Sequence, residues 1–135
     1  MCLIVYSNSV TQQAMRVYKV LVKKGDKYYS PFRYMPYSIG KTYRTYEDDA
    51  PHIRNFKEPL STITNEGFHA YTNLYAAEVL KEDYNYLCEN LYFKLPIKYV
   101  VTEWEIPEDT VCWTSRNEQE IAATKMVFVK EINRY

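Results

Sequence analysis

The chain contains little glycine, only 3 of its 135 residues. Gly-rich phosphate-binding loops, Walker motifs and the Gly-x-Ser-x-Gly nucleophile elbow each need glycines close together, and none of these motifs is present. Histidine is scarce as well, since His52 and His69 are the only two. These shortages exclude the Gly-based motifs of nucleotide-binding enzymes and serine hydrolases.

Cysteine is also sparse, and the three residues Cys2, Cys88 and Cys112 lie far apart with no Cys-x-x-Cys pair. This pattern predicts reduced thiols packed as small apolar groups, and it predicts no metal site. No run of about 18 apolar residues exists, so we expect no membrane-spanning helix. Residues 1–6 are apolar but lack the basic start and cleavage site of a signal peptide. We therefore expect a cytoplasmic protein, in the cytoplasm of the host cell if a phage encodes it.

Neither sign of charge is in excess, because Lys plus Arg and Asp plus Glu number 17 each. A broad electrostatic contact with nucleic acid needs a basic excess, which leaves only a local basic patch open. Zero net charge gives little repulsion between copies, so an oligomer is possible. The composition, 47% apolar and 25% charged, is that of a globular protein, and the length predicts one domain spanning 1–135.

Tyrosine is the residue in greatest excess, with 15 copies. Codon bias in an AT-rich genome is the simpler explanation, because Lys, Asn and Ile are also abundant. A stacking surface for bases or other flat ligands is the alternative. The two explanations stay open at this point.

Runs of β-branched and aromatic residues predict a mostly antiparallel sheet of about six strands. Residues 15–23 form the first strand, a turn at 24–26 follows, and residues 27–30 return as the second arm of a hairpin. Residues 97–106 have apolar side chains in both alternating sets, which is typical of a central strand covered on both faces. Further strands are predicted at 41–46, 67–71, 111–114 and 125–132, and irregular or looped stretches at 31–36, 47–51 and 115–120.

A helical segment is predicted directly after strand 67–71, with Thr72 or Asn73 as its N-cap. Apolar residues between 74 and 80 form one side of a helix, and those between 83 and 91 can start a second helical piece before Pro96. The predicted fold class is α+β: a single domain with a mostly antiparallel sheet packed with one or two helices.

Two sets of residues could carry acid–base chemistry. His69 is the natural base for a catalytic triad, although a histidine within an aromatic strand is more often a packed residue. Glu103 and Glu105 face the same side of their strand, with Trp104 opposite. Two such carboxylates could act as acid and base, or could simply form a solvated face.

Glu118 and Glu120 follow Arg116 in the polar stretch before the last strand. Carboxylates in such a stretch could lie over a cleft or face water. Both alternatives remain open from the sequence.

Four short segments occur in the order found in uncharacterised small proteins of phages and prophages. They are Val-Tyr-Lys-Val at 17–20, Tyr-Ser-Ile-Gly-Lys-Thr-Tyr at 37–43, Gly-Phe-His-Ala at 67–70 leading into Ala76-Ala77, and Ile-Ala-Ala-Thr-Lys-Met at 121–126. The chain resembles that group over most of its length. The resemblance implies an accessory protein of a mobile element and implies no biochemical activity.

The segment Gly-Phe-His-Ala-Tyr at 67–71 and the pair Asn117-Glu118 also resemble motifs of ADP-ribosyltransferases of the poly(ADP-ribose) polymerase type. That resemblance implies that the late Glu binds a ribose. The residue that grips NAD would fall near Lys19, and His69 would occupy the position of the Tyr that stacks on nicotinamide. Lys cannot reproduce the planar clamp of Arg, so a nucleotide-binding cleft without transferase activity is equally consistent with the resemblance.

The leading hypothesis is a non-enzymatic, phage-type accessory protein that binds a host protein or a nucleotide-like ligand, with counter-defence as one role that fits it. An ADP-ribosyltransferase-like enzyme using NAD is one alternative, and a structural or assembly protein is another. No cofactor, metal or membrane contact is expected. The predicted ligand-binding residues are Lys19, His69, Tyr71, Glu118 and Glu120.

Overall fold

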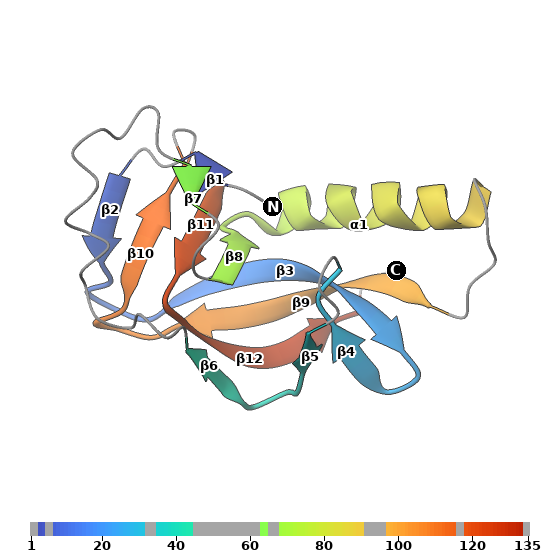
Figure 1. Cartoon of the computed structure of the whole chain (residues 1–135), viewed down its shortest axis with the longest axis horizontal. Helices are drawn as coiled ribbons and strands as arrows, with labels where there is room; N and C mark the ends of the chain where they lie inside the picture. Colours follow the sequence, from blue (N-terminus) through green and yellow to red (C-terminus); the bar gives the residue numbers. More distant parts are fainter. Residues whose placement is uncertain are drawn as a thin grey trace.

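The computed structural model describes residues 3–4, 7–31, 35–44, 63–64, 68–90, 97–115 and 118–133. Over these residues the chain is a mostly antiparallel sheet with one helix, so the predicted α+β class is confirmed (Figure 1). The described elements are β1 (Leu3–Ile4), β2 (Ser7–Val10), β3 (Met15–Lys24), β4 (Lys27–Tyr29), β5 (Pro36–Tyr37), β6 (Thr42–Arg44), β7 (Ile63–Thr64), β8 (Phe68–Tyr71), α1 (Leu74–Asn90), β9 (Lys98–Ile106), β10 (Val111–Thr114), β11 (Glu120–Ala123) and β12 (Lys125–Ile132).

Some sequence predictions fall outside the described residues. These are the acidic loop at 47–51 and the residues Cys2, His52, Gly67, Pro96, Arg116 and Asn117.

The main sheet has ten strands, so the prediction of about six was wrong. Eight strands follow one another in the order β2-β10-β11-β8-β3-β9-β12-β6, and β4 and β5 extend the sheet from β3. The strands that the sequence pattern missed, β2, β5 and β11, are only two to four residues long. Such short strands are too brief to show an alternating pattern, and only their tertiary pairing identifies them. β1 and β7 form a separate two-stranded sheet.

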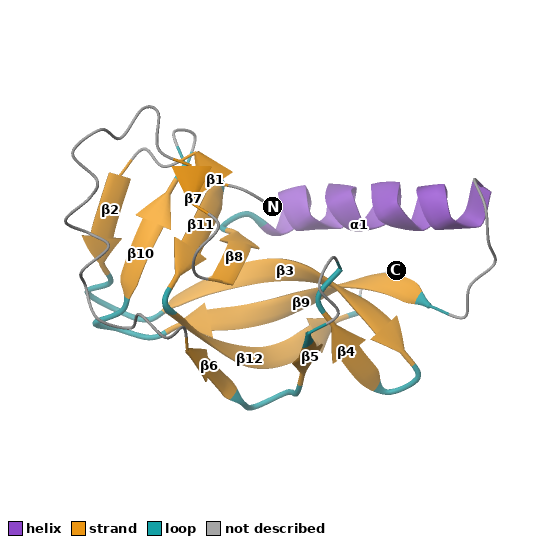
Figure 2. Cartoon of the chain, in the orientation of Figure 1, coloured by secondary structure: helices purple, strands orange, loops and turns teal. Residues whose placement is uncertain are grey.

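The long strands β3 and β9 form the centre of the main sheet (Figure 2). They pair antiparallel from Met15 opposite Ile106 to Lys23 opposite Lys98. β12 covers the other edge of β9, so the predicted central strand at 97–106 is confirmed. Because side chains alternate along a strand, this pair carries two faces with different environments.

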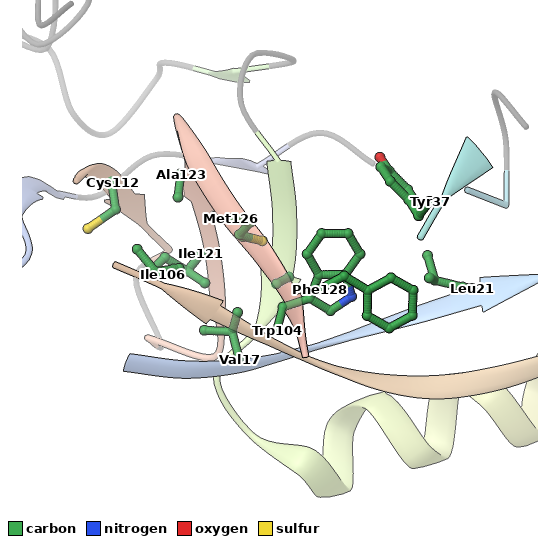
Figure 3. Close-up of a cluster of buried hydrophobic side chains, with 11 residues drawn as sticks. Val17, Leu21, Tyr37, Trp104, Ile106, Cys112, Ile121, Ala123, Met126 and Phe128 are labelled. Carbon is green, nitrogen blue, oxygen red and sulfur yellow. The ribbon is translucent and has the colours of Figure 1, made fainter. Parts of the chain in front are cut away.

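The two faces of the sheet bury different sets of side chains. One face packs against α1 through Val20, Val101 and Ala77. The opposite face holds a larger cluster, in which Trp104 and Phe128 stack with ring centroids 4.7 Å apart (Figure 3). The buried members of that cluster are Val17, Leu21, Tyr37, Ala70, Trp104, Ile106, Cys112, Ile121, Ala123, Met126 and Phe128.

The helix α1 is continuous, so the second helical piece predicted from residue 83 is part of the same helix. Lys81 and Glu82 join the two apolar stretches and are good helix formers, so nothing interrupts the helix there. Asn73 is the N-cap, because its Oδ1 accepts a hydrogen bond from the N–H of Tyr75 at 2.7 Å. The strand-to-helix step predicted from the sequence is therefore confirmed from Phe68 onward.

Asn85 fastens α1 to the sheet beyond the end of β12. Tyr99 pairs with Val22 of β3 on one edge of β9, but on the opposite edge the last residue pair of β12 with β9 joins Ile132 to Val101, so β12 does not reach Tyr99. The Asn85 side chain takes that place: its Oδ1 accepts the N–H of Tyr99 at 2.8 Å, and its Nδ2 donates to the C=O at 3.1 Å. One amide side chain thus pairs with β9 as a strand would.

Replacing Asn85 with Ala removes both of these bonds to the backbone of Tyr99. We expect the free energy of unfolding to fall by about 1–3 kcal/mol, as for the loss of partners of part-buried polar groups. Urea unfolding measures this change. Glu82→Ala, at an exposed position of the same helix, is the control and should leave the midpoint unchanged. Equal midpoints for the two variants would contradict the role assigned to Asn85.

Candidate functional site

Lys19 lies on the face of β3 that packs away from α1. Val17 and Leu21, two residues before and after it, belong to the large cluster on that face. Tyr18 and Val20 point to the helix side instead. Strict alternation therefore directs a charged side chain toward an apolar cluster.

Aromatic rings from three strands surround the Lys19 ammonium. The Nζ atom lies 5.4 Å from the ring centroid of Trp104, 5.7 Å from that of Tyr37 and 5.8 Å from that of Phe68. Tyr43 completes the group, with its ring 4.9 Å from Tyr37 and 6.4 Å from Phe68. We call these four rings the aromatic cage. Trp104 and Tyr37 are buried, whereas Tyr43 and Phe68 are half-buried and form its accessible side.

A buried hydroxyl, that of Thr102, links the backbone of Lys19 to a ring of the cage. The Oγ1 atom of Thr102 donates to the backbone carbonyl of Lys19 at 2.8 Å and accepts the indole N–H of Trp104 at 2.8 Å. Thr102 and Trp104 are both fully buried. The hydroxyl therefore joins the β3 backbone to the ring nearest the amine.

The Lys19 amine has no counter-ion and no hydrogen-bond partner in the part of the chain that the structure describes. Burial lowers the pKa of this amine from 10.5 to about 8. The lowered pKa of this half-buried cation means that the free energy lost with its hydration exceeds the attraction of the groups around it. This holds even though each of the three rings contributes roughly 0.5–1 kcal/mol of attraction. Groups perturbed in this way are concentrated at functional sites.

Lys23 lies on the same face of β3, one repeat beyond Leu21, and provides an internal comparison. Its Nζ atom forms an ion pair with Glu131 at 2.8 Å, and the Tyr28 hydroxyl donates to the same carboxylate oxygen at 2.7 Å. The hydrogen bond with Glu131 raises the pKa of Lys23. Burial would raise the pKa of Glu131, but the hydrogen bonds from Lys23 and Tyr28 outweigh it and lower that pKa. Among the described residues, one lysine of this face therefore has a carboxylate partner and the other has none.

Three of the remaining predicted ligand residues, His69, Tyr71 and Glu120, lie on the other face of the sheet. Tyr71 belongs to the cluster under α1 and stands opposite Glu120 in the pairing of β8 with β11. Burial raises the pKa of Tyr71, and the nearby charge of Glu120 adds to the effect. By alternation from Phe68 and Ala70, His69 also points to this face. The structure therefore brings Tyr71 and Glu120 together but separates them from Lys19.

Glu118 acts through its backbone rather than its exposed side chain. Its carbonyl accepts the Thr72 hydroxyl at 2.6 Å, and the N–H of Thr72 donates to the carbonyl of Gln119 at 2.8 Å. Glu118 has a positive φ of 59°, in the left-handed region that side chains seldom adopt. These contacts fasten the turn before β11 to the start of α1.

The carboxylates of Glu103 and Glu105 lie on one side of β9, with Trp104 opposite, as the sequence predicted. Arg16 forms ion pairs with both of them, at 3.6 Å from Glu103 and 3.5 Å from Glu105. Exposed pairs of this kind contribute little to stability. A charged face stabilised by one arginine fits this geometry better than an acid–base pair does.

The cage rings were absent from the residues that the sequence selected. Lys19 was selected through the resemblance to ADP-ribosyltransferases; its charge between Val17 and Leu21, on an apolar strand face, is a signal in the sequence that could also have identified it. Tyr37, Phe68 and Trp104 come from separate strands, and only the sheet order brings them together. Among the described residues there is no group of three or more His, Cys, Asp or Glu that could hold a metal ion. No helix in the same ranges is long and apolar enough to cross a membrane.

Comparison with known proteins returned no matching family model, no matching curated protein and no matching solved structure.

Replacing Lys19 with Met, which keeps an unbranched stem and removes the charge, should stabilise the protein at pH 7. We expect a gain of roughly 1–3 kcal/mol in the free energy of unfolding, because the cost of burying an unpaired cation disappears. Since the folded pKa of about 8 lies below the unfolded value, the wild type becomes more stable as the pH rises from about 8 toward 10.5. The gain of Lys19→Met should therefore shrink between pH 7 and pH 9.

Urea unfolding at the two pH values checks this difference. Lys24→Met, at an exposed position of the same strand, is the matched control and should change stability at neither pH. A Lys19→Met variant that is less stable than the wild type at pH 7 would contradict the assignment of Lys19 as an uncompensated cation.

Proposed function

We propose that this protein is a non-enzymatic binding protein whose ligand is a small, flat anion of nucleotide type, held at Lys19 and the aromatic cage. The observation that carries the proposal is the half-buried Lys19 amine, which lies among three rings and has no counter-ion in the described part of the chain. An anionic ligand would supply the missing charge. Natural proteins retain a buried charge without a counter-ion mainly where function requires it.

The accessible side of the cage suits a flat group. Tyr43 and Phe68 are the half-buried rings, and bases stack on such rings with about 1–3 kcal/mol each. Lys41 adds a second charge at this side, since its exposed amine lies 5.7 Å from the Tyr43 ring centroid. A charge-assisted hydrogen bond from Lys19 to a phosphate adds about 1.5–3 kcal/mol. These terms support a dissociation constant of roughly micromolar to millimolar.

The placement of the other residues favours binding over ADP-ribose transfer. A transferase of the resembling type would need the positions of Lys19, His69 and a late glutamate on one NAD molecule. Here Lys19 faces the aromatic cage, whereas His69 faces the α1 side and Glu118, the late glutamate of that resemblance, lies in the turn before β11. Together with the resemblance to small phage proteins, this supports an accessory role in which a nucleotide-like signal of the host is sequestered.

Isothermal titration with AMP, ADP-ribose and a cyclic nucleotide tests the proposal, with adenosine as the uncharged comparison. Lys19→Met should weaken the binding of the phosphate-bearing ligands at least tenfold, as expected for the loss of about 1.5–3 kcal/mol. It should change the weak binding of adenosine far less. Lys24→Met is again the control and should bind as the wild type does.

Proton uptake provides a second readout that is specific to Lys19. At pH 8 about half of the free protein carries a neutral Lys19, and a bound anion raises the pKa of the amine. Titration in two buffers of different ionisation enthalpy should therefore show proton uptake at pH 8 and little at pH 6. Absence of binding by every nucleotide tested would refute the proposal. Cleavage of labelled NAD that is lost in Glu118→Gln and Glu120→Gln would replace it with the transferase.

A further inference from the structure

The neutral form of the Lys19 amine has chemistry that its charged form lacks. A lysine attacks a carbonyl carbon only with a free electron pair, which requires the unprotonated amine. Apolar surroundings and the absence of a carboxylate both favour that form. Lys19 has both features: Trp104, Tyr37 and Phe68 surround its amine, and no described carboxylate lies within ion-pair distance of it.

The other lysines described on β3 differ from Lys19 in one of these two features. Lys23 is held charged by Glu131 at 2.8 Å. Lys24 is exposed at the end of the same strand, where water stabilises its charge. Lys19 is thus chemically distinct from its neighbours on a single strand.

We propose that Lys19 is a covalent capture site for aldehydes carried on flat aromatic compounds, which it binds as an imine within the aromatic cage. The half-buried rings of Tyr43 and Phe68 would hold the aromatic part against the cage. Buried Trp104 and Tyr37 would limit the access of water to the new bond, and so slow its hydrolysis.

The reaction balances without any further reagent. The nitrogen lone pair of Lys19 attacks the carbonyl carbon to form a carbinolamine, and the nitrogen loses one proton while the oxygen gains one. The hydroxyl then leaves as water with the second proton of the amine, and a carbon–nitrogen double bond forms. One aldehyde and one amine give one imine and one water, with no change of oxidation state.

The pH dependence of capture comes from the ionisation of the Lys19 amine. Among the described residues, the titratable or charged side chains at the cage besides Lys19 are the phenols of Tyr37 on β5 and Tyr43 on β6 and the exposed amine of Lys41, which lies 5.7 Å from the Tyr43 ring centroid. The charged pair of Lys23 and Glu131 lies further along the same face and is internally neutral. Capture should therefore accelerate from pH 6 to pH 9, with a midpoint near the Lys19 pKa of about 8.

This inference uses the site of the proposed function but not its nucleotide. Reversible anion binding needs the charged amine, whereas capture needs the neutral one. Either can fail while the other holds, and the probes below separate the two.

Pyridoxal 5′-phosphate is a suitable probe because it is a flat aromatic aldehyde, and pyridoxine 5′-phosphate is the matched compound without the aldehyde. The protein is incubated with limiting probe and cyanoborohydride, which reduces an imine to a stable amine, and the labelled lysines are identified by peptide mass spectrometry. We expect Lys19 to be labelled at least tenfold faster than Lys24 at pH 8. The rate at Lys24 should keep rising beyond pH 9, whereas that at Lys19 levels off.

Lys19→Met and Lys19→Arg provide the variant controls, and circular dichroism establishes that each is folded. Both should lose the fast phase of labelling. Lys19→Arg keeps a positive charge that can attract the phosphate of pyridoxine 5′-phosphate. Labelling of Lys19 no faster than Lys24, or a fast phase that persists in both variants, would overturn the inference. Binding of pyridoxine 5′-phosphate without fast labelling would overturn capture while leaving the proposed anion site intact.

Discussion

The long antiparallel pairing of β3 with β9 is the constraint on which the other features depend. Once these strands are in register, alternation assigns every side chain of both to one of two faces. The face with Val20 and Val101 receives α1, and the face with Val17 and Trp104 receives the aromatic cluster. A shift of one residue would exchange the side chains of the two faces. The burial of apolar side chains on both faces therefore fixes the register.

Lys19 and Lys23 show how the same strand produces two outcomes from one residue type. Lys23 lies where β12 supplies Glu131 and the β4 hairpin supplies Tyr28, so its charge is compensated. Lys19 lies where β5, β8 and β9 supply rings. The rings attract a cation but do not replace its lost hydration. The difference between the two lysines therefore comes from their neighbours in space, not from their local sequence.

The sequence predicted the parts of the fold that have a local physical signature. β3, β9, β10 and β12 have the composition of strands over most of their length, and Asn73 is a recognisable cap. The short strands β2, β5 and β11 have no such signature, because each has only two to four residues, and β2 and β11 also pair with strands far along the chain. The aromatic cage was hidden because its rings likewise come from separate strands. Lys19 was selected through a resemblance to a known family, but the residues around it were not selected.

The uncompensated amine at position 19 also has an evolutionary meaning. Because an apolar residue fits that face of β3 better than Lys19 does, stability alone would select against the lysine. Under the proposed function, a lineage that uses the site should keep the lysine among these rings, whereas one that has lost the need should drift toward Met or Leu there. The residue found at this single position should then separate chains that retain the activity of the site from chains that retain only the fold.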